Sequence, residues 1–330
     1  MNSHSRRQLL VSASFAALAG CVPTPKPALN SVRPWIIAHR GASGLLPEHT
    51  LEAYQLGAEQ GADVIEPDLV MTQDGALIAR HDHYLGASTD VSVKFPERQR
   101  TGSGIATPDW FSEDFTASEF ALLRARQPMP QRDAKHNDRY RVPSFAQILD
   151  LRAALELKLA RPLYVYPELK LPSTFAGLGL DPVPAFVTAY RSRSKAEQAR
   201  IWIQCFEPAA LQRLRDELGT QANLTQLLPA TNGKQAIPVT LVEIADYAQA
   251  IGPNKSTVID VEGRSTGLLE AAHKLGLQVH PWTFRDDVLP NHYQSASDEL
   301  RAYFDLGVDG VFTDFPATAV AVRALLNQIL

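Results

Sequence analysis

The chain has 330 residues, which is enough for one large domain or two of ordinary size. Hydrophobic residues make up 45% and charged residues 21%, so a packed core can form, and no long internal apolar stretch is suited to span a bilayer. The formal net charge of -4 gives no electrostatic basis for nucleic-acid binding.

The N-terminal stretch resembles an export signal. Arg6 and Arg7 supply positive charge ahead of an apolar run, Leu9 to Ala19, that is too short for a spanning helix. Leu18-Ala19-Gly20-Cys21 then resembles the lipobox, where bacterial lipoproteins are cleaved and lipidated on the new N-terminal cysteine. The arginine pair also resembles a twin-arginine signal. An ordinary secretory signal or a membrane anchor is the alternative.

These features divide the chain into parts. We expect a signal peptide over residues 1–20, a lipidated Cys21 with a flexible proline-containing tether over residues 21–33, and a folded domain over residues 34–330. The protein would then be exported, as a periplasmic or cell-envelope lipoprotein that meets the membrane only through Cys21. Cys205 would lack an intramolecular partner, so the fold would depend on its core.

After the tether, apolar runs of strand length alternate with segments that carry helix start and stop signals. We predict strands over Trp35–His39, Val64–Leu69, Leu163–Leu169, Ile201–Phe206, Leu224–Leu228, Val258–Val261, Leu277–Trp282 and Val311–Thr313. We predict helices over Thr50–Gln60, Phe145–Leu159, Ala209–Leu218, Leu241–Ile251, Leu268–Leu275 and Leu300–Leu306.

This alternation predicts an α/β fold of parallel βα units, and the count and length fit a closed TIM (β/α)8 barrel. A doubly wound open sheet is the alternative, but Gly41-Ala42-Ser43-Gly44 matches its glycine-rich phosphate loop poorly. Polar residues at the carboxyl ends of several strands also favour the barrel. Residues 85–140, after the second strand region, are far longer than an ordinary loop of about 2–6 residues. We expect an insertion there, packed beside the barrel mouth or forming a surface elaboration.

Carboxylates gather at two predicted strand ends. Glu66 and Asp68 are two residues apart, so strand periodicity points both to one side, where they repel each other unless they share a cation. Glu168 ends the next strand, two residues before Lys170. Three carboxylates form an all-oxygen site suited to Ca²⁺ or Mg²⁺. Surface carboxylates and a surface ion pair are the alternatives.

Imidazoles flank this cluster. His39 ends the first strand, and His81 follows the apolar run Ala76–Ala79. Imidazole titrates near neutral pH, so this pair is suited to acid–base chemistry. His83 leaves a His-x-His zinc site as an alternative, which the carboxylate neighbours disfavour. We expect the side chain of Asp82 to point away from His81.

Arg40 and Lys170 supply positive charge beside the cluster, where they can hold an anionic oxyacid. Together with a metal and two imidazoles, they indicate phosphoryl transfer to water or to a hydroxyl. The sequence has no Gly-Lys-Ser/Thr phosphate loop, so nucleotide triphosphatase chemistry is disfavoured.

With these residues assembled, the sequence resembles the glycerophosphodiester phosphodiesterase family. Pro47-Glu48-His49-Thr50, the run from His81 to Tyr84 and the long insertion look most like its exported bacterial branch. The resemblance rests on His39-Arg40-Gly41, Pro47-Glu48-His49-Thr50, Glu66-Pro67-Asp68, His81-Asp82, Val142-Pro143-Ser144-Phe145, Glu168-Leu169-Lys170, Gln204-Cys205-Phe206, Trp282-Thr283-Phe284 and the run from Gly310 to Pro316.

The resemblance implies a TIM-barrel enzyme that hydrolyses glycerophosphodiesters, such as glycerophosphocholine and glycerophosphoethanolamine, to sn-glycerol 3-phosphate and an alcohol. Calcium is typical of the exported branch, and magnesium is the second choice. Motif matching implies these roles: metal ligands Glu66, Asp68 and Glu168; acid–base residues His39 and His81; phosphate contacts Arg40 and Lys170; site-lining residues Glu48 and Gln204; and an apolar wall of Trp282 and Phe284.

Two positions depart from the family pattern, since His49 stands where Asn is common and Cys205 where Ser is common. Neither touches the expected ligands or imidazoles. Three other functions stay open: a related phospholipase of the C or D type acting on intact lipids, a lipid-anchored surface protein that uses the barrel as a binding scaffold, and a zinc amidohydrolase. The sequence gives no oligomeric state.

Overall fold

The computed structural model describes residues 33–102, 105–231, 234–235 and 239–326. The predicted signal peptide and the predicted lipidation site at Cys21 lie outside these residues. Among the described residues, no helix combines the length and apolar character needed to cross a membrane.

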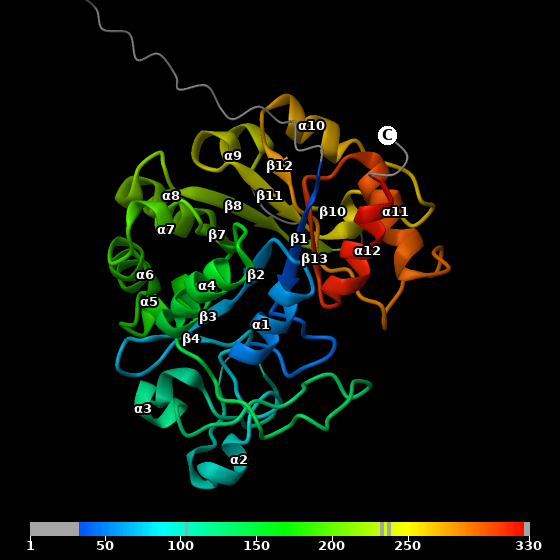
Figure 1. The fold of residues 1–330 in the computed structure, drawn as a ribbon. Helices are drawn as coiled ribbons and strands as arrows, with labels where there is room; N and C mark the ends of the chain where they lie inside the picture. Colours follow the sequence, from blue (N-terminus) through cyan, green and yellow to red (C-terminus); the bar gives the residue numbers. More distant parts are fainter. Residues whose placement is uncertain (1–32, 103–104, 232–233, 236–238, 327–330) are drawn as a thin grey trace, which may run out of the picture.

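The core of the fold is a ring of parallel strands (Figure 1). The first strand, β1 (Trp35–His39), pairs with β2 (Val64–Glu66) on one side and with the last strand, β13 (Gly310–Thr313), on the other. The remaining ring strands are β3 (Asp68–Met71), β5 (Tyr164–Val165), β6 (Glu168–Leu169), β7 (Trp202–Cys205), β8 (Asn223–Leu228), β11 (Ala250–Pro253) and β12 (Gln278–Val279).

Two of the ring strands are interrupted by proline. Pro67 separates β2 from β3, and Pro167 separates β5 from β6, because proline has no amide hydrogen to donate to a neighbouring strand. After each proline the next strand continues the parallel pairing, because β3 pairs with β6 and β6 pairs with β7. The interruptions therefore leave one continuous barrel wall.

Backbone hydrogen bonds close the ring between the segment after β12 and β13. The amide of Phe312 donates to the carbonyl of Pro281 at 3.1 Å, and the amide of Phe284 donates to the carbonyl of Phe312 at 2.8 Å. The fold is therefore the predicted TIM barrel. Its interior holds Ile37, Val64, Tyr166, Trp202, Ala250 and Phe312, which pack together as one buried cluster.

Helices surround the strands and bury the larger apolar core between the two layers (Figure 1). A capping box formed by Ser144 and Gln147 is present at the start of α4. The helices are α1 (Leu51–Glu59), α4 (Phe145–Leu159), α5 (Pro172–Gly177), α6 (Pro182–Arg191), α7 (Lys195–Gln198), α8 (Pro208–Leu218), α9 (Leu241–Tyr247), α10 (Leu268–Lys274), α11 (Ala296–Leu306) and α12 (Pro316–Leu326).

One predicted strand is wrong. Residues Val258–Val261 follow the short 3-10 helix η3 (Lys255–Thr257) and form no strand, whereas β11 occupies residues assigned to the end of a helix. Gly252 lies within β11, where a Cβ atom would stand 2.6 Å from Cδ2 of Leu227, so the glycine permits close packing between strands.

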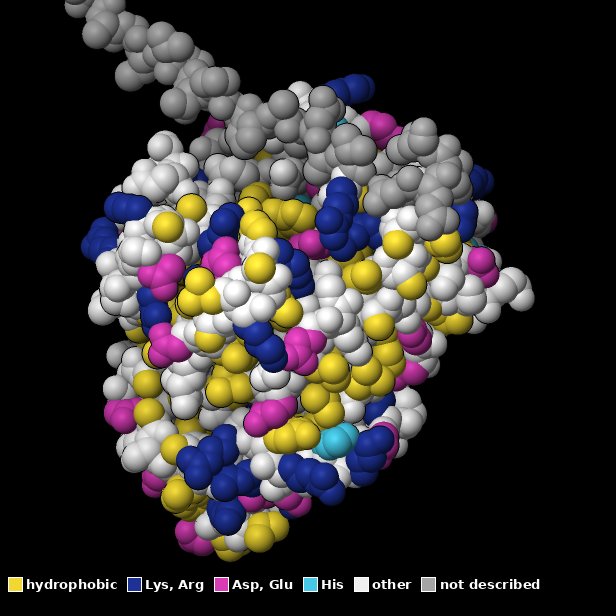
Figure 2. Space-filling view, in the orientation of Figure 1, with side chains coloured by type: hydrophobic (Ala, Val, Ile, Leu, Met, Phe, Trp, Pro, Cys, Tyr) yellow, Lys and Arg dark blue, Asp and Glu magenta, His cyan; other side chains and the backbone are white. Residues whose placement is uncertain are grey.

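The segment over residues 85–140 forms a lobe beside the barrel (Figure 1). It follows β4 (Leu77–Ala79), which pairs antiparallel with β3. The lobe has its own buried cluster, which includes Trp110, Phe115 and Phe120. Figure 2 shows Lys and Arg side chains gathered on the visible face where this lobe lies. Its short helices are α2 (Val91–Lys94), η1 (Pro96–Arg98), η2 (Ser112–Asp114) and α3 (Ala117–Phe120).

A second small feature lies after β8, where β9 (Ala230–Thr231) and β10 (Lys234–Gln235) pair antiparallel.

Candidate active site

A cavity of about 200 Å³ opens where the parallel strands end. This is the face on which TIM barrels carry their active sites. Its lining residues come from nearly every strand of the ring and from the loops that follow. They are His39, Arg40, Glu66, His81, Glu168, Lys170, Gln204, Phe206, Leu227, Asn254, Lys255, Trp282, Thr283, Arg285 and Phe312.

Three carboxylates meet at this end of the barrel, and two of them, Glu66 and Glu168, line the cavity. One oxygen from each of Glu66, Asp68 and Glu168 lies within 4.8 Å of the others, and all three residues are buried. The strand register causes this, because Asp68 pairs with Glu168 across the β3–β6 ladder. The Nζ atom of Lys170 lies 3.0 Å from Glu168 Oε1. The Nε2 atom of Gln204 donates to Glu66 Oε1 at 2.8 Å.

The three buried carboxylates repel one another, and burial and neighbouring charges shift their pKa values in different directions. Burial, with the charge of Asp68, raises the pKa of Glu66 well above its usual range. Burial likewise raises the pKa of Glu168 to about 8, against the opposing charge of Lys170. Burial opposes ionisation of Asp68 too, but Lys170 and Arg40 outweigh it and hold the pKa of that carboxyl well below its usual range.

This donor set fits a hard divalent cation. A cation among the three carboxylates offsets their repulsion and allows all of them to ionise. The buried Oε1 atom of Gln204, beside Glu66, also finds no hydrogen-bond partner within the described residues. Oxygen ligands without thiolates favour Ca²⁺ or Mg²⁺ over zinc. Within the described ranges, Glu66, Asp68 and Glu168 form the single acidic or imidazole cluster close enough to hold a metal.

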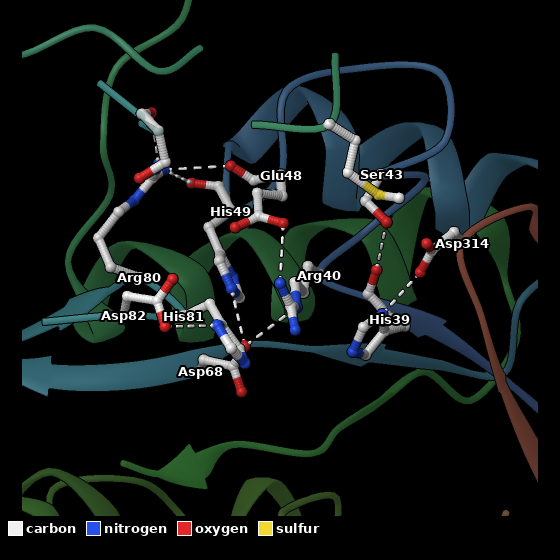
Figure 3. A network of polar contacts seen from close by, with 12 residues as sticks. His39, Arg40, Ser43, Glu48, His49, Asp68, Arg80, His81, Asp82 and Asp314 are labelled. Carbon is white, nitrogen blue, oxygen red and sulfur yellow. Dashed lines mark hydrogen bonds and ion pairs between the residues drawn. The ribbon is translucent and has the colours of Figure 1, made fainter. Parts of the chain in front are cut away.

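His39 is tied to the far end of the chain. Its Nδ1 atom lies 2.6 Å from Oδ1 of Asp314, the residue that follows β13 (Figure 3). Burial disfavours the charge on Asp314, but His39, Arg285 and Arg132 outweigh burial and hold the pKa of this carboxyl well below its usual range. An ionised carboxylate can only accept, so Nδ1 of His39 donates and Nε2 keeps its lone pair. Burial, with the charge of Arg40, lowers the pKa of His39 to about 4, so the ring is neutral at neutral pH.

His81 stands on the loop after β4 and is more open to solvent, with 34% of its side chain exposed. Its Nδ1 atom lies 2.9 Å from Oδ1 of Asp82 (Figure 3). The expectation that Asp82 points away is therefore wrong. Strand alternation does not apply there, because the strand ends at Ala79 and the chain bends through residues 81–83. The pKa of Asp82 is lowered, since contact with His81 outweighs partial burial.

Arg40 is held by carboxylates around it. Its Nη1 atom donates to Glu48 Oε2 at 2.9 Å, and its Nε atom lies 3.2 Å from Asp68 Oδ2. Its backbone amide donates to Glu66 Oε2 at 2.8 Å. Arg40 adopts a φ of 59°, in the left-handed region that non-glycine residues rarely occupy. The turn thus aims both the amide and the guanidinium of Arg40 at the carboxylate cluster.

Gly41 makes this turn possible. Its φ is 87°, and a Cβ atom there would lie 2.5 Å from the backbone of Ala53 in α1. The next residues bring His49 into contact with the cluster, since its Nε2 atom lies 3.0 Å from Asp68 Oδ2. The expectation that His49 touches none of the metal ligands is therefore wrong. The buried guanidinium of Arg80 donates to the carbonyls of Glu48 and His49 at 3.1 and 3.0 Å and so fixes this loop (Figure 3).

The two aromatic residues predicted as an apolar wall have different positions. Trp282 lines the cavity, its ring meets Phe206 edge-on, and its Nε1 atom donates to the carbonyl of Gly252 at 2.7 Å. Phe284 is 1% exposed, packs edge-on against Tyr303 and lies outside the cavity lining. Because β12 ends at Val279, strand alternation does not fix the directions of side chains 282 and 284, and Phe284 packs against Tyr303 of α11.

Several residues that line one of the two cavities at the barrel mouth are not among the predicted site residues. Asp314 lies within the run from Gly310 to Pro316, so its place at the end of the last strand was a usable signal. No sequence signal marked Arg132, because it comes from the middle of the 85–140 lobe. The others are Phe206, Leu227, Asn254, Lys255, Thr283, Arg285 and Phe312.

Comparisons with known proteins agree with this geometry. A glycerophosphodiester phosphodiesterase of Haemophilus influenzae is 30% identical over 326 residues, spanning 86% of this chain and 88% of that protein. The glycerophosphodiester phosphodiesterase GDPD6 of Arabidopsis thaliana is 32% identical, spanning 88% of this chain and 86% of its own length.

Solved structures share the fold. A glycerophosphodiester phosphodiesterase from Agrobacterium tumefaciens superposes with a TM-score of 0.55 at 22% identity, covering 87% of this chain and 99% of its own. An Oleispira antarctica phosphodiesterase, solved with the product sn-glycerol-3-phosphate, superposes with a TM-score of 0.62 at 17% identity, covering 88% and 97%. The sequence model of the glycerophosphoryl diester phosphodiesterase family matches residues 39–318. The chain belongs to the glycerophosphoryl diester phosphodiesterase family.

Proposed function

We propose that this protein hydrolyses glycerophosphodiesters, such as glycerophosphocholine and glycerophosphoethanolamine, to sn-glycerol 3-phosphate and an alcohol. The observation that carries the proposal is one cavity at the barrel mouth that is lined by two imidazoles, two cations and two members of the carboxylate triad, Glu66 and Glu168. Relatives of 30 and 32% identity that carry this activity in their names match most of the chain.

Arg40 and Lys170 are the groups we assign to the phosphoryl anion. Both line the cavity, and both are mostly shielded from water, with 17 and 12% of their side chains exposed. A cation held in a site that excludes water stabilises a phosphoryl oxygen more strongly than an exposed one does. Trp282 supplies an apolar face on the same cavity for the carbon atoms of glycerol or of the alcohol.

We assign Glu66, Asp68 and Glu168 to a divalent cation. Calcium is the first choice because it takes about six to eight oxygen ligands in flexible geometry, and magnesium, which demands a regular octahedron, is the second. When bound, such an ion polarises a phosphoryl oxygen and lowers the pKa of a coordinated nucleophile.

We assign His39 as the general base and His81 as the general acid. His39 is neutral and presents the free lone pair of Nε2, which can take the proton of the attacking O–H as the new P–O bond forms. As the bond from phosphorus to the alcohol oxygen breaks, His81 gives its proton to that oxygen, and the contact of its Nδ1 atom with Asp82 orients the ring. The attacking oxygen belongs to water, or to the neighbouring glycerol hydroxyl, in which case water then opens a cyclic phosphate.

The test is release of glycerol 3-phosphate from glycerophosphocholine by the purified protein and by His39→Ala and His81→Ala. Removal of a general acid or base costs about 10²–10⁴ in rate, so each variant should lose at least a hundredfold in kcat while its circular dichroism is unchanged. Near-normal turnover by either folded variant would refute its assigned role. Vesicles of phosphatidylcholine form the second arm, and faster turnover on intact lipid would favour the phospholipase alternative.

We also propose that the protein belongs to the exported bacterial branch and is anchored by lipid on Cys21. The branch is supported by the runs Pro47–Thr50 and His81–Tyr84 and by the long insertion, and the anchor is supported by the lipobox pattern of residues 18–21 after the charged and apolar N-terminal stretch. Metabolic labelling with palmitate should mark the wild-type chain and not Cys21→Ser, and fractionation should find the wild type in the cell envelope. Equal labelling of the two would contradict the proposal.

A further inference from the structure

We propose that the lobe over residues 85–140 is part of the catalytic apparatus, because its Arg132 positions His39 by clamping Asp314. The proposal rests on the proposed function, in which His39 is the general base. Arg132 itself is a positioning residue, since it acts through the carboxylate and is not assigned to the reacting atoms.

The side chain of Arg132 reaches out of the lobe into the barrel mouth, where only 4% of it is exposed. Its Nη2 atom donates to Oδ2 of Asp314 at 2.6 Å. Its Nε atom donates to Asp287 at 2.7 Å, and its Nη1 atom donates to the carbonyl of Ser43 at 3.1 Å. One residue of the lobe therefore binds three separate loops of the barrel, those after β1, β12 and β13.

The contacts on Asp314 explain what this does for His39. One carboxylate oxygen, Oδ1, accepts from His39, while Oδ2 accepts from both Arg132 and Arg285. Two planar donors on Oδ2 fix the rotation of the carboxylate, and Oδ1 in turn fixes the ring plane of His39. Arg285 alone is a weaker restraint, because 28% of its side chain is exposed.

The lobe reaches His39 by a second route as well. The Nε2 atom of Gln127 donates to the carbonyl of Ser43 at 3.0 Å, the same atom that accepts from Arg132. The hydroxyl of Ser43 donates to the carbonyl of His39 at 2.8 Å (Figure 3). The backbone and the ring of His39 are thus both restrained by groups that the lobe holds.

Other arginines of the lobe differ from Arg132. Arg126 pairs with Asp138, and Arg98 pairs with Glu119, so both of these ion pairs stay inside the lobe. Both carboxylate partners of Arg132 belong to the barrel. A second cavity of about 210 Å³ lies beside His39, and lobe residues Pro128 and Met129 form part of its wall. The lobe therefore meets the barrel at His39, which a surface elaboration would not require.

The experiment compares Arg132→Ala, Arg132→Lys and the matched control Arg126→Ala in turnover of glycerophosphocholine, with kcat and KM measured separately. Loss of a charge-assisted hydrogen bond that orients a base should lower kcat of Arg132→Ala about 10- to 100-fold, with KM changed less than about threefold. Arg132→Lys should recover part of kcat, and Arg126→Ala should stay within about twofold of the wild type.

A double-mutant cycle then tests the route. In an Asp314→Asn background, Arg132→Ala should add less than about twofold, because the carboxylate through which it acts is gone. Full additivity, an unchanged kcat in folded Arg132→Ala, or a rise in KM alone would overturn the proposal.

A nuclear magnetic resonance measurement separates this proposal from the proposed function. The proton on Nδ1 of His39 should give a low-field signal that shifts or broadens in Arg132→Ala or Arg132→Lys and not in Arg126→Ala. If that signal is unaffected, the positioning role is wrong even where the wild type is active. If the signal responds while the wild type shows no turnover, Arg132 positions His39 as proposed and the proposed function is what fails.

Discussion

His39 donates from Nδ1 to Oδ1 of Asp314 at 2.6 Å, so one hydrogen bond joins the ends of the first and last strands of the barrel, 275 residues apart. Because β1 and β13 are neighbours in the ring, closure of the barrel is what brings the two side chains together.

Asp314→Asn should lower kcat by about 10²–10⁴, because the neutral amide no longer requires Nδ1 to be the protonated nitrogen and no longer fixes the ring. The measurement is steady-state turnover of glycerophosphocholine at neutral pH. Asp286→Asn, on the loop after β12, is the control and should keep normal turnover. Wild-type kcat in folded Asp314→Asn would show that this contact is not used in the reaction.

Glu168→Gln should weaken calcium binding by at least about 100-fold, since it removes one of three charged ligands and leaves the other two. Isothermal titration calorimetry measures the affinity directly. Glu59→Gln, at an exposed ion pair with Lys158, is the matched control and should bind calcium as the wild type does. Equal affinities for the two variants would place the metal elsewhere.

Trp282→Ala and Phe284→Ala should separate binding from stability. Trp282 lines the cavity, so its loss should change KM or kcat. Phe284 is 1% exposed in the core, so its loss should cost about 3–5 kcal/mol of unfolding free energy and leave the kinetics of the folded fraction close to normal. The measurements are urea unfolding and steady-state kinetics on both variants. Lost stability in Trp282→Ala together with changed kinetics in Phe284→Ala would contradict the placement of these side chains.

His280 should make the barrel sensitive to acid. Burial lowers the pKa of His280 from 6.5 to about 4, with a weak opposing effect from Asp309. The unfolded chain therefore binds the proton more readily, so the stability contribution is complete above pH 6.5 and is lost as the pH falls toward about 4. The difference between the two pKa values, 6.5 and about 4, corresponds to about 3 kcal/mol of unfolding free energy.

His280→Gln has no group at this position that takes up a proton, so it should flatten the pH dependence of the unfolding free energy between pH 6.5 and about 4. His39 and His49, whose pKa values are also lowered to about 4 by burial, keep their contribution in this variant. The measurement is the urea midpoint at several pH values. A wild-type slope in His280→Gln would show that the ring is not buried in its neutral form.

The metal cluster could be predicted from the sequence because local periodicity determines it. Glu66 and Asp68 stand two apart on one strand, and Glu168 sits in register on the next. Pro67 interrupts the ladder between them without turning either side chain away. The alternation of strands and helices likewise predicted the barrel, since each βα unit carries its own start and stop signals.

What the sequence could not supply depends on contacts between distant segments. Gly252 acts as a packing residue only because β8 lies beside β11, and no local pattern indicates that the segment after Tyr247 forms a strand. Asp82 turns to His81 because the strand has already ended. Arg132 lies 182 residues before the carboxylate that it clamps, and no local pattern marks it among the arginines of the lobe.

Turnover of glycerophosphocholine before and after chelation is the decisive measurement. The protein should release glycerol 3-phosphate, lose at least about a hundredfold in rate in EDTA, and recover on addition of calcium, or of magnesium to a lesser degree. Turnover that is unaffected by complete chelation would contradict the metal-dependent site. Absence of glycerol 3-phosphate from metal-loaded, folded protein would contradict the proposed reaction itself.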